Sequence, residues 1–257
     1  MEIYLTDTHT HLYAEEFDAD RDICIQAGFD AGVNRLFLPH CDSGSTERML
    51  ELTRKYPSNF FPMMGLHPCS VKENYKSELA HVEKWLGQHP FYAIGEIGMD
   101  LYWEVRYKDE QELVLKKQIE WSLDHHLPIV LHSRNSFDEI YNILLEYKKT
   151  ELHGIFHCFS GNTEQAKKIV DLGFYLGIGG VVTFKNSGLD QVVRNINLEH
   201  LVLETDAPYL APIPFRGKRN EARYLKIIAE AIATIKGIDL ETVAAVTTVN
   251  AQKIFKI

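Results

Sequence analysis

The chain has 257 residues, of which 45% are hydrophobic and 25% are charged, and its formal net charge is −9. This acidic balance argues against broad, charge-driven binding to nucleic acid or to an anionic membrane, although it leaves room for a small basic site. The length is large for an ordinary domain but normal for one α/β barrel, so we expect a single domain over residues 1–257.

Short apolar, β-rich runs recur along the chain and alternate with longer amphipathic segments. The predicted strands cover residues 3–5, 33–38, 60–64, 92–96, 129–131, 154–156, 174–178 and 200–203. Helical periodicity is clearest over residues 110–125, 136–147, 163–172, 221–235 and 240–255. Strands that alternate with helices indicate a parallel sheet, and eight such runs favour a TIM-type (β/α)8 barrel over an open sheet.

Reactive side chains follow these runs. In a parallel barrel the functional face lies at the C-terminal ends of the strands, where the loops to the helices begin. The residues that follow successive runs, or end them, are His9 and His11, His40, His67, Glu96, His132, His157, and Glu204 with Asp206. Six of the chain's 12 histidines therefore fall at predicted strand ends, which indicates one shared metal site on this rim.

Two local patterns strengthen the prediction of a metal site. His9 and His11 are two residues apart, so in an extended chain both rings project to the same side and can hold one ion. Glu96 lies in an apolar run between Gly95 and Gly98, where a carboxylate is costly unless it is paired or binds a metal. A buried Arg or Lys partner is the alternative for Glu96.

The chemistry of the candidate ligands restricts the metal. The set mixes imidazole with carboxylate and lacks thiolate, which suits Zn, Mn, Ni, Co or Fe, and Mg less well. Six ligands around one central carboxylate are more than a single tetrahedral zinc needs. We therefore expect two divalent metal ions with Glu96 as the bridging carboxylate.

These motifs resemble the TatD-related deoxyribonuclease family, a branch of the amidohydrolase-like metal-dependent hydrolases. The matching segments are residues 7–12, 65–68, 94–100, 132–134, 157–161, 204–209 and 214–220. The resemblance implies a TIM-type barrel that hydrolyses phosphodiester bonds of DNA, in some members as a 3′ to 5′ exonuclease on single strands. It also implies a divalent metal centre held by His9, His11, Glu96, His132, His157 and Asp206.

We assign provisional roles to the site residues. Asp206 is expected to orient the attacking water and to accept its proton, while Glu96 bridges the ions. His67 is expected to contact phosphate or another site residue rather than an ion, and Glu204 is expected to hold a ligand histidine. Tyr102 and Trp103, at a position where the family commonly has aromatics, can stack on a base. The basic residues expected to bind substrate on the same rim are Arg134, Arg216, Lys218 and Arg219.

The expected partner is DNA, in particular a single-stranded end, because a few basic residues suit a few phosphates better than a long duplex. An ordinary solvated loop is the alternative for residues 216–219. Two other functions stay open. A metallohydrolase of ester or C–N bonds, such as an aminoacyl-tRNA deacylase, is one, although such enzymes often have a carboxylated lysine where this chain has Glu96. A barrel with a purely structural metal is the other, but structural zinc sites have closed coordination shells.

The chain lacks features of a secreted or membrane protein. Its cysteines, Cys24, Cys41, Cys69 and Cys158, form no C-x-x-C pair and suit a reducing compartment. The N-terminus does not resemble a signal peptide, and no apolar stretch is long enough to span a bilayer. We expect a cytoplasmic protein with no membrane partner; the metal, DNA against RNA, exo- against endonuclease action and the oligomeric state stay open.

Overall fold

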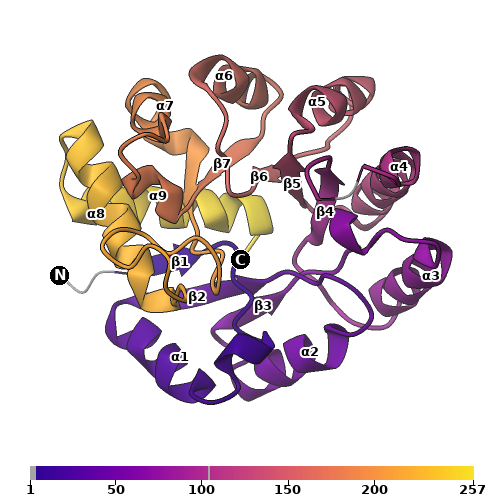
Figure 1. Ribbon diagram of the computed structural model, residues 1–257, viewed down its shortest axis with the longest axis horizontal. Coiled ribbons are helices and arrows are strands. Elements are labelled where there is room, and N and C mark those ends of the chain that lie inside the picture. Colours follow the sequence, from indigo (N-terminus) through magenta and orange to yellow (C-terminus); the bar gives the residue numbers. More distant parts are fainter. Residues whose placement is uncertain (1–3, 104) are drawn as a thin grey trace.

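A computed structural model describes residues 4–103 and 105–257 as a (β/α)8 barrel, in which a ring of helices surrounds the strands (Figure 1). The strands are β1 (Leu5–Asp7), β2 (Val33–Leu38), β3 (Phe60–Pro62), β4 (Ile94–Asp100), β5 (Ile129–Arg134), β6 (Gly154–Phe156), β7 (Tyr175–Ile178) and β8 (Leu201–Leu203). The α-helices are α1 (Arg21–Asp30), α2 (Thr46–Lys55), α3 (Tyr75–Leu86), α4 (Lys108–His125), α5 (Phe137–Glu146), α6 (Thr163–Asp171), α7 (Leu189–Asn195), α8 (Leu225–Lys236) and α9 (Leu240–Phe255). Short 3-10 turns are η1 (Glu15–Phe17), η2 (Pro68–Ser70), η3 (Gly180–Thr183), η4 (Leu198–His200) and η5 (Ala222–Tyr224).

The barrel consists of two parallel sheets that meet at two junctions. One sheet has the order β1-β2-β3 and the other β4-β5-β6-β7-β8. At the first junction, Met64 forms an isolated parallel bridge with Ile94 just beyond the end of β3. At the second, the backbone N–H of Thr8 donates to the carbonyl of Leu203 over 2.9 Å, which joins β1 to β8. These links close the ring.

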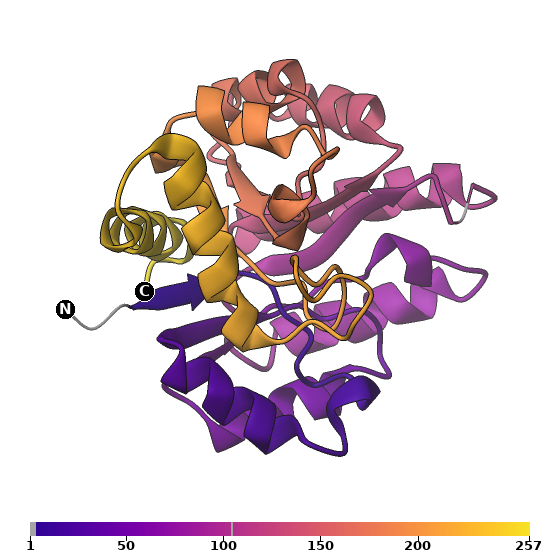
Figure 2. The same cartoon turned by 60° about the vertical axis from the view of Figure 1, so that its left-hand side comes forward.

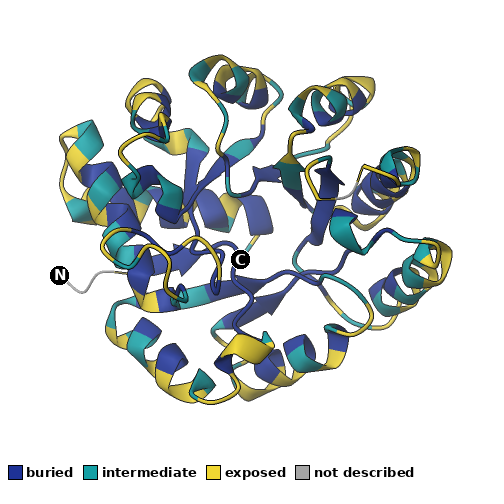
Figure 3. Cartoon of the chain, viewed as in Figure 1, coloured by how far each residue is buried: buried dark blue, intermediate teal, exposed yellow. Residues whose placement is uncertain are grey.

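The interior of the barrel is packed, and helix α9 closes one end of it. Val130, Ile155 and Val202 belong to an interior cluster that also includes residues of α9. The ring of Phe255 in α9 stacks on that of Phe37 in β2, with centroids 3.7 Å apart. Figure 3 shows buried strands inside and exposed residues on the outer faces of the helices. The opposite end remains for the loops that follow the strands, including the long loop after β8 (Figure 2).

The structure confirms the predicted fold class but shifts several boundaries. Strand β4 is predicted at residues 92–96, yet it runs to Asp100, so Glu96 lies inside the strand. Gly98 permits this extension: its φ is +137°, and a Cβ there would lie 2.0 Å from the carbonyl oxygen of His132 in β5. Strand β5 likewise extends to Arg134.

The ends of the chain show smaller differences. Strand β1 covers Leu5–Asp7, whereas the sequence predicts residues 3–5. Residue 3 of that prediction lies outside the described residues. Helix α9 has the predicted bounds, whereas the segment predicted as a helix from residue 221 divides into η5 and α8. Among the residues that the structure describes, no helix is long and apolar enough to cross a membrane.

Candidate metal centre

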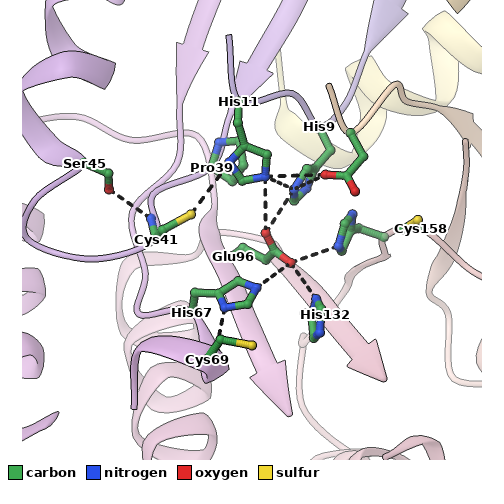
Figure 4. A network of polar contacts seen from close by, with 12 residues as sticks. His9, His11, Pro39, Cys41, Ser45, His67, Cys69, Glu96, His132 and Cys158 are labelled. Carbon is green, nitrogen blue, oxygen red and sulfur yellow. Dashed lines mark hydrogen bonds and ion pairs between the residues drawn. The ribbon is translucent and has the colours of Figure 1, made fainter. Parts of the chain in front are cut away.

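Glu96 lies at the centre of the strand-end cluster because a local irregularity removes it from the sheet pairing. The pairing of β4 with β5 shifts between Gly95 and Ile97, so Glu96 has no partner in that register. Its side chain is only 3% exposed. Figure 4 shows the carboxylate surrounded by histidines from several strand ends.

The two carboxylate oxygens of Glu96 face two different groups of nitrogen atoms. Oε2 lies 3.1 Å from Nε2 of His9 and 3.7 Å from Nε2 of His11. Oε1 lies 2.9 Å from Nδ1 of His132 and 2.9 Å from Nε2 of His157. One carboxylate is therefore shared between two sets of possible ligands, as in a bridged pair of ions.

The alternation of the strands explains why these side chains converge. Val130 and Ile155 point into the barrel, so the residues two positions later, His132 and His157, point into its open mouth. His9 and His11 follow β1 with the same spacing. Asp206 completes the first set from the loop after β8, with its Oδ1 atom 3.5 Å from Nε2 of His11 and 3.8 Å from Nε2 of His9.

Acceptors outside the centre engage the outer ring nitrogen of two histidines. Both ring nitrogens of His132 face carboxylates: Nε2 lies 2.9 Å from Oδ2 of Asp100, and Nδ1 lies 2.9 Å from Oε1 of Glu96. Because ionised carboxylates only accept, the ring can donate at both nitrogens, and a neutral ring that keeps its bond to Asp100 has its hydrogen on Nε2. The hydroxyl of Tyr13 donates to the carbonyl of Pro39 over 2.6 Å, so its oxygen accepts from Nδ1 of His11 over 3.0 Å. In the neutral rings, lone pairs therefore face the centre from Nδ1 of His132 and Nε2 of His11.

Glu204 lies behind a third histidine, His157. Its Oε1 atom lies 3.4 Å from Nδ1 of His157 and accepts the backbone N–H of Cys158. Its side chain is fully buried. A carboxylate behind a ligand histidine orients the ring and raises its basicity.

The electrostatics of the cluster favour added positive charge. Burial raises the pKa of Glu96, but the positive charges of His157, His67 and His9 lower it by more. The pKa of this carboxyl therefore lies well below its usual value. Burial likewise raises the pKa of Asp206, yet the nearby His11 ring and the charge of His157 outweigh burial and lower the pKa below its ordinary value, so this carboxyl is ionised. Burial disfavours a charged His157 ring, but Glu96 and Glu204 raise its pKa well above the ordinary range.

The residues fit divalent metal ions on the chemistry of their donor atoms. Lone pairs of His11 and His132 point at anionic carboxylate oxygens, an arrangement that is repulsive unless a cation or added protons lie between them. Possible ligand atoms lie within 4.8 Å of one another in three groups: His9, His11 and Asp206; His9, Glu96 and His157; and His67, Glu96 and His132. Imidazole and carboxylate ligands of this kind suit transition metals.

Two residues that the sequence analysis singles out, His40 and Arg219, make contacts away from the cluster around Glu96. His40 also follows a strand, but its ring bonds to the carbonyl of Gly65 and to the Thr46 hydroxyl, away from Glu96. The sequence places Arg219 among the substrate-binding residues, whereas its guanidinium binds both carboxylate oxygens of Asp20, at 2.8 and 2.7 Å. Asp20 thus compensates the charge of Arg219, and the pair links the loop of Arg219 to the start of α1.

The other basic residues are exposed. The guanidinium of Arg134 lies over the rings of Tyr102 and Trp103, 4.3 and 5.3 Å from their centroids. These two aromatic residues are 54% and 68% exposed, which is unusual for side chains of this size. Arg216 lies over the ring of Phe184 at 4.4 Å, and Lys218 is exposed in the same loop.

Three residues that position the ligands were not predicted. Asp100 orients His132, and Tyr13 orients His11. Asp7 is fully buried and accepts the backbone N–H groups of His9 and Thr205, while burial raises its pKa to about 8. The signal for Asp100 was present, because it ends the same apolar run as Glu96, but Tyr13 carries no motif that distinguishes it from a core tyrosine.

Comparisons with known proteins agree with this geometry. A sequence model described as TatD related DNase matches residues 6–256. The uncharacterized metal-dependent hydrolase YabD of Bacillus subtilis is 37% identical over 254 residues, which cover 98% of this chain and 99% of the relative. A Salmonella typhimurium protein named 3′-5′ ssDNA/RNA exonuclease TatD is 31% identical, with 98% of each chain covered.

A solved structure supports the same assignment. The crystal structure of YjjV, a TatD homologue from Escherichia coli, superposes with a TM-score of 0.93 at 27% identity, and the match covers 100% of both chains. The shared fold places the strand ends, and therefore the cluster around Glu96, at the mouth of the same kind of barrel. From the whole-length match and this geometry, the chain belongs to the TatD-related DNase family of metal-dependent hydrolases.

Proposed function

We propose that the protein hydrolyses phosphodiester bonds of DNA with two divalent ions, and that it acts as a 3′ to 5′ exonuclease on single strands. The two-ion proposal rests on the two carboxylate oxygens of Glu96, which face different pairs of histidines. Oε2 faces His9 and His11, and Oε1 faces His132 and His157. Bound divalent ions would supply Lewis-acid polarisation of a phosphoryl oxygen and a more acidic water.

Asp206 is the proposed general base. Its pKa lies below the ordinary value despite burial, so at neutral pH the side chain is the ionised carboxylate, the form that a general base requires. Its Oδ1 atom is close to the nitrogen atoms of His9 and His11, which keeps it at the first set of ligands. There it can orient a water molecule and take its proton as the bond to phosphorus forms.

A phosphodiester substrate is supported by exposed positive charge in an acidic protein. Arg134, Arg216 and Lys218 are exposed and can contact phosphate, whereas Arg219 is engaged by Asp20. The exposed rings of Tyr102 and Trp103 beside Arg134 offer a surface on which an unpaired base can stack. The name of the Salmonella relative supports the same substrate class. A reducing compartment such as the cytoplasm suits the four free cysteines.

The test uses metal-stripped protein and oligonucleotides of one sequence. Single-stranded DNA, duplex DNA and RNA with a 5′ label are incubated with Zn²⁺, Mn²⁺, Mg²⁺, Ni²⁺ or Co²⁺ in turn. We expect products that shorten stepwise from the 3′ end on single strands. The Asp206→Asn variant, purified identically, controls for contaminating nucleases.

The alternative function is tested in the same experiment. A simple carboxylic ester and an aminoacyl-tRNA are included as substrates. Metal-dependent turnover of either one, with no cleavage of any oligonucleotide, would refute the nuclease proposal and favour an ester or amide hydrolase. Internal cuts in the oligonucleotide would retain the phosphodiester chemistry and refute only the exonuclease mode.

A further inference from the structure

His67 differs from the neighbouring histidines in the direction of its hydrogen bonds. The residue precedes the η2 turn, and its Nδ1 atom accepts the backbone N–H of Cys69 over 3.0 Å. A backbone amide nitrogen only donates, so Nδ1 of His67 must carry a lone pair. The hydrogen of the neutral ring is then on Nε2, which lies 3.3 Å from Oε1 of Glu96.

The rings of His11 and His132 have the opposite arrangement. Each uses the nitrogen away from the centre as a donor, to the oxygen of Tyr13 or to the carboxylate of Asp100. In the neutral form, each ring can therefore turn a lone pair to the centre, as a metal ligand must, and Nδ1 of His132 does so at 2.9 Å from Oε1 of Glu96. His67 presents an N–H group there, and a nitrogen that bears hydrogen cannot bind a metal ion.

The position of His67 makes this N–H group accessible to a substrate. Its side chain is 16% exposed, close to the 17% of His132 and above the 0% of His9 and the 5% of His157. It lies in the segment after β3, and its ring makes a T-shaped contact with that of His132 at a centroid distance of 4.7 Å. Its backbone N–H also donates to the carbonyl of Cys41 over 2.9 Å, so both the backbone and the ring are held in place.

We propose that His67 is not a metal ligand, although its distances are compatible with one, and that it donates its Nε2–H hydrogen bond to an oxygen of the substrate phosphoryl group. This inference rests on the proposed phosphodiesterase function for the identity of the substrate. The hydrogen stays on the ring throughout, so no proton transfer is required. A fixed donor of this kind stabilises the negative charge that develops in the transition state.

The first test distinguishes a donor from a ligand without measuring activity. His67→Gln, which retains an N–H donor, and His67→Leu, which removes it, are compared with His132→Gln as the matched ligand control. After loading with Zn²⁺, both His67 variants should hold as many ions per chain as the parent by elemental analysis, whereas His132→Gln should hold fewer. Loss of an ion in both His67 variants, with the fold intact by circular dichroism, would show that His67 is a ligand.

Nitrogen-15 NMR of the histidine rings gives a second, direct readout. The signals of His67 are assigned by their absence in His67→Gln. Its Nδ1 should have the shift of a bare nitrogen and its Nε2 that of an N–H group, and both should persist when Zn²⁺ is added. The Nδ1 signal of His132 should move on the same addition. The opposite tautomer of His67 would overturn the proposal.

The kinetic test examines the donor role itself. At equal metal content, kcat of His67→Leu should fall by roughly 10²-fold, the effect of removing one such donor, and His67→Gln should recover part of it. Two variants that both turn over within a few-fold of the parent would refute the donor role. If the parent hydrolyses only a carboxylic ester, the comparison is made on that ester, so that the phosphodiester assignment fails while the donor role is still judged.

Discussion

Asp100 provides a sharp test of how the centre is held, because one buried carboxylate serves both a histidine and a loop. Its Oδ2 atom accepts from Nε2 of His132 at 2.9 Å, while Oδ1 accepts the backbone N–H groups of Tyr102 and Trp103 at 2.9 and 2.8 Å. In Asp100→Asn, the amide oxygen is needed by the two loop donors, so the amide nitrogen turns toward His132. Two N–H groups cannot face each other, and His132 must therefore move its hydrogen to Nδ1, where it blocks the lone pair that faces Glu96.

The size of the effect follows from this loss of orientation. Substituting a residue that orients a ligand histidine typically costs roughly 10–100-fold in metal affinity, which corresponds to about 1.4–2.7 kcal/mol. Isothermal titration of Zn²⁺ or Mn²⁺ into the metal-free protein measures it. Asp20→Asn is the matched control, because it makes the same substitution at an aspartate paired with Arg219, and its metal affinity should equal that of the parent. Parent-like affinity in folded Asp100→Asn would refute the tautomer argument.

Three further predictions concern the base, the basic loop and the buried histidine. Asp206→Asn should lower turnover by roughly 10²–10⁴-fold at equal metal content, because the amide cannot accept a proton, and turnover within a few-fold of the parent would place the base elsewhere. The double variant Arg216→Ala, Lys218→Ala should bind a single-stranded oligonucleotide more weakly, and the slope of log affinity against log salt concentration should flatten by about 1.4, two contacts at 0.7 each. An unchanged slope in this variant would exclude phosphate contacts by the loop. Arg219→Ala should instead lower thermal stability. Burial lowers the pKa of His40 to about 4, so the unfolded chain takes up a proton below pH 6.5 that the folded chain rejects. Relative to His40→Gln, the parent should therefore lose about 3 kcal/mol of unfolding free energy between pH 7 and pH 4, and parallel stability curves in urea at these pH values would contradict this.

The parts of the fold that could be predicted are those that depend on local periodicity. The bounds of α9 follow from an amphipathic pattern with a clear start, since Asp239 caps the helix by accepting the N–H of Thr242. The extension of β4 to Asp100 could not be predicted in this way. It depends on Gly98 fitting closely against β5, and a glycine in a short apolar run reads equally well as the end of a strand.

The candidate site shows the same division. The placement of His132 and His157 follows from the alternation of side chains along their strands, which a sequence displays directly. The engagement of Arg219 by Asp20 does not, because it joins residues that are far apart in the chain and lie on two loops. The tautomers of the histidines are also beyond the sequence, since they depend on donors and acceptors such as the backbone of Cys69.

The candidate metal centre lies between the two sheets of the barrel. His9 and His11 follow β1, in the three-stranded sheet, while Glu96, His132 and the other candidate ligands belong to the five-stranded sheet. A metal ion bound by ligands from both sheets would hold the sheets together across the junction of β1 with β8. Metal binding would then stabilise the closed barrel against separation of β1 from β8, by about 2.7 kcal/mol at a metal concentration 100 times Kd. Chelation should hence accelerate hydrogen exchange first at amides such as that of Thr8, which joins β1 to β8.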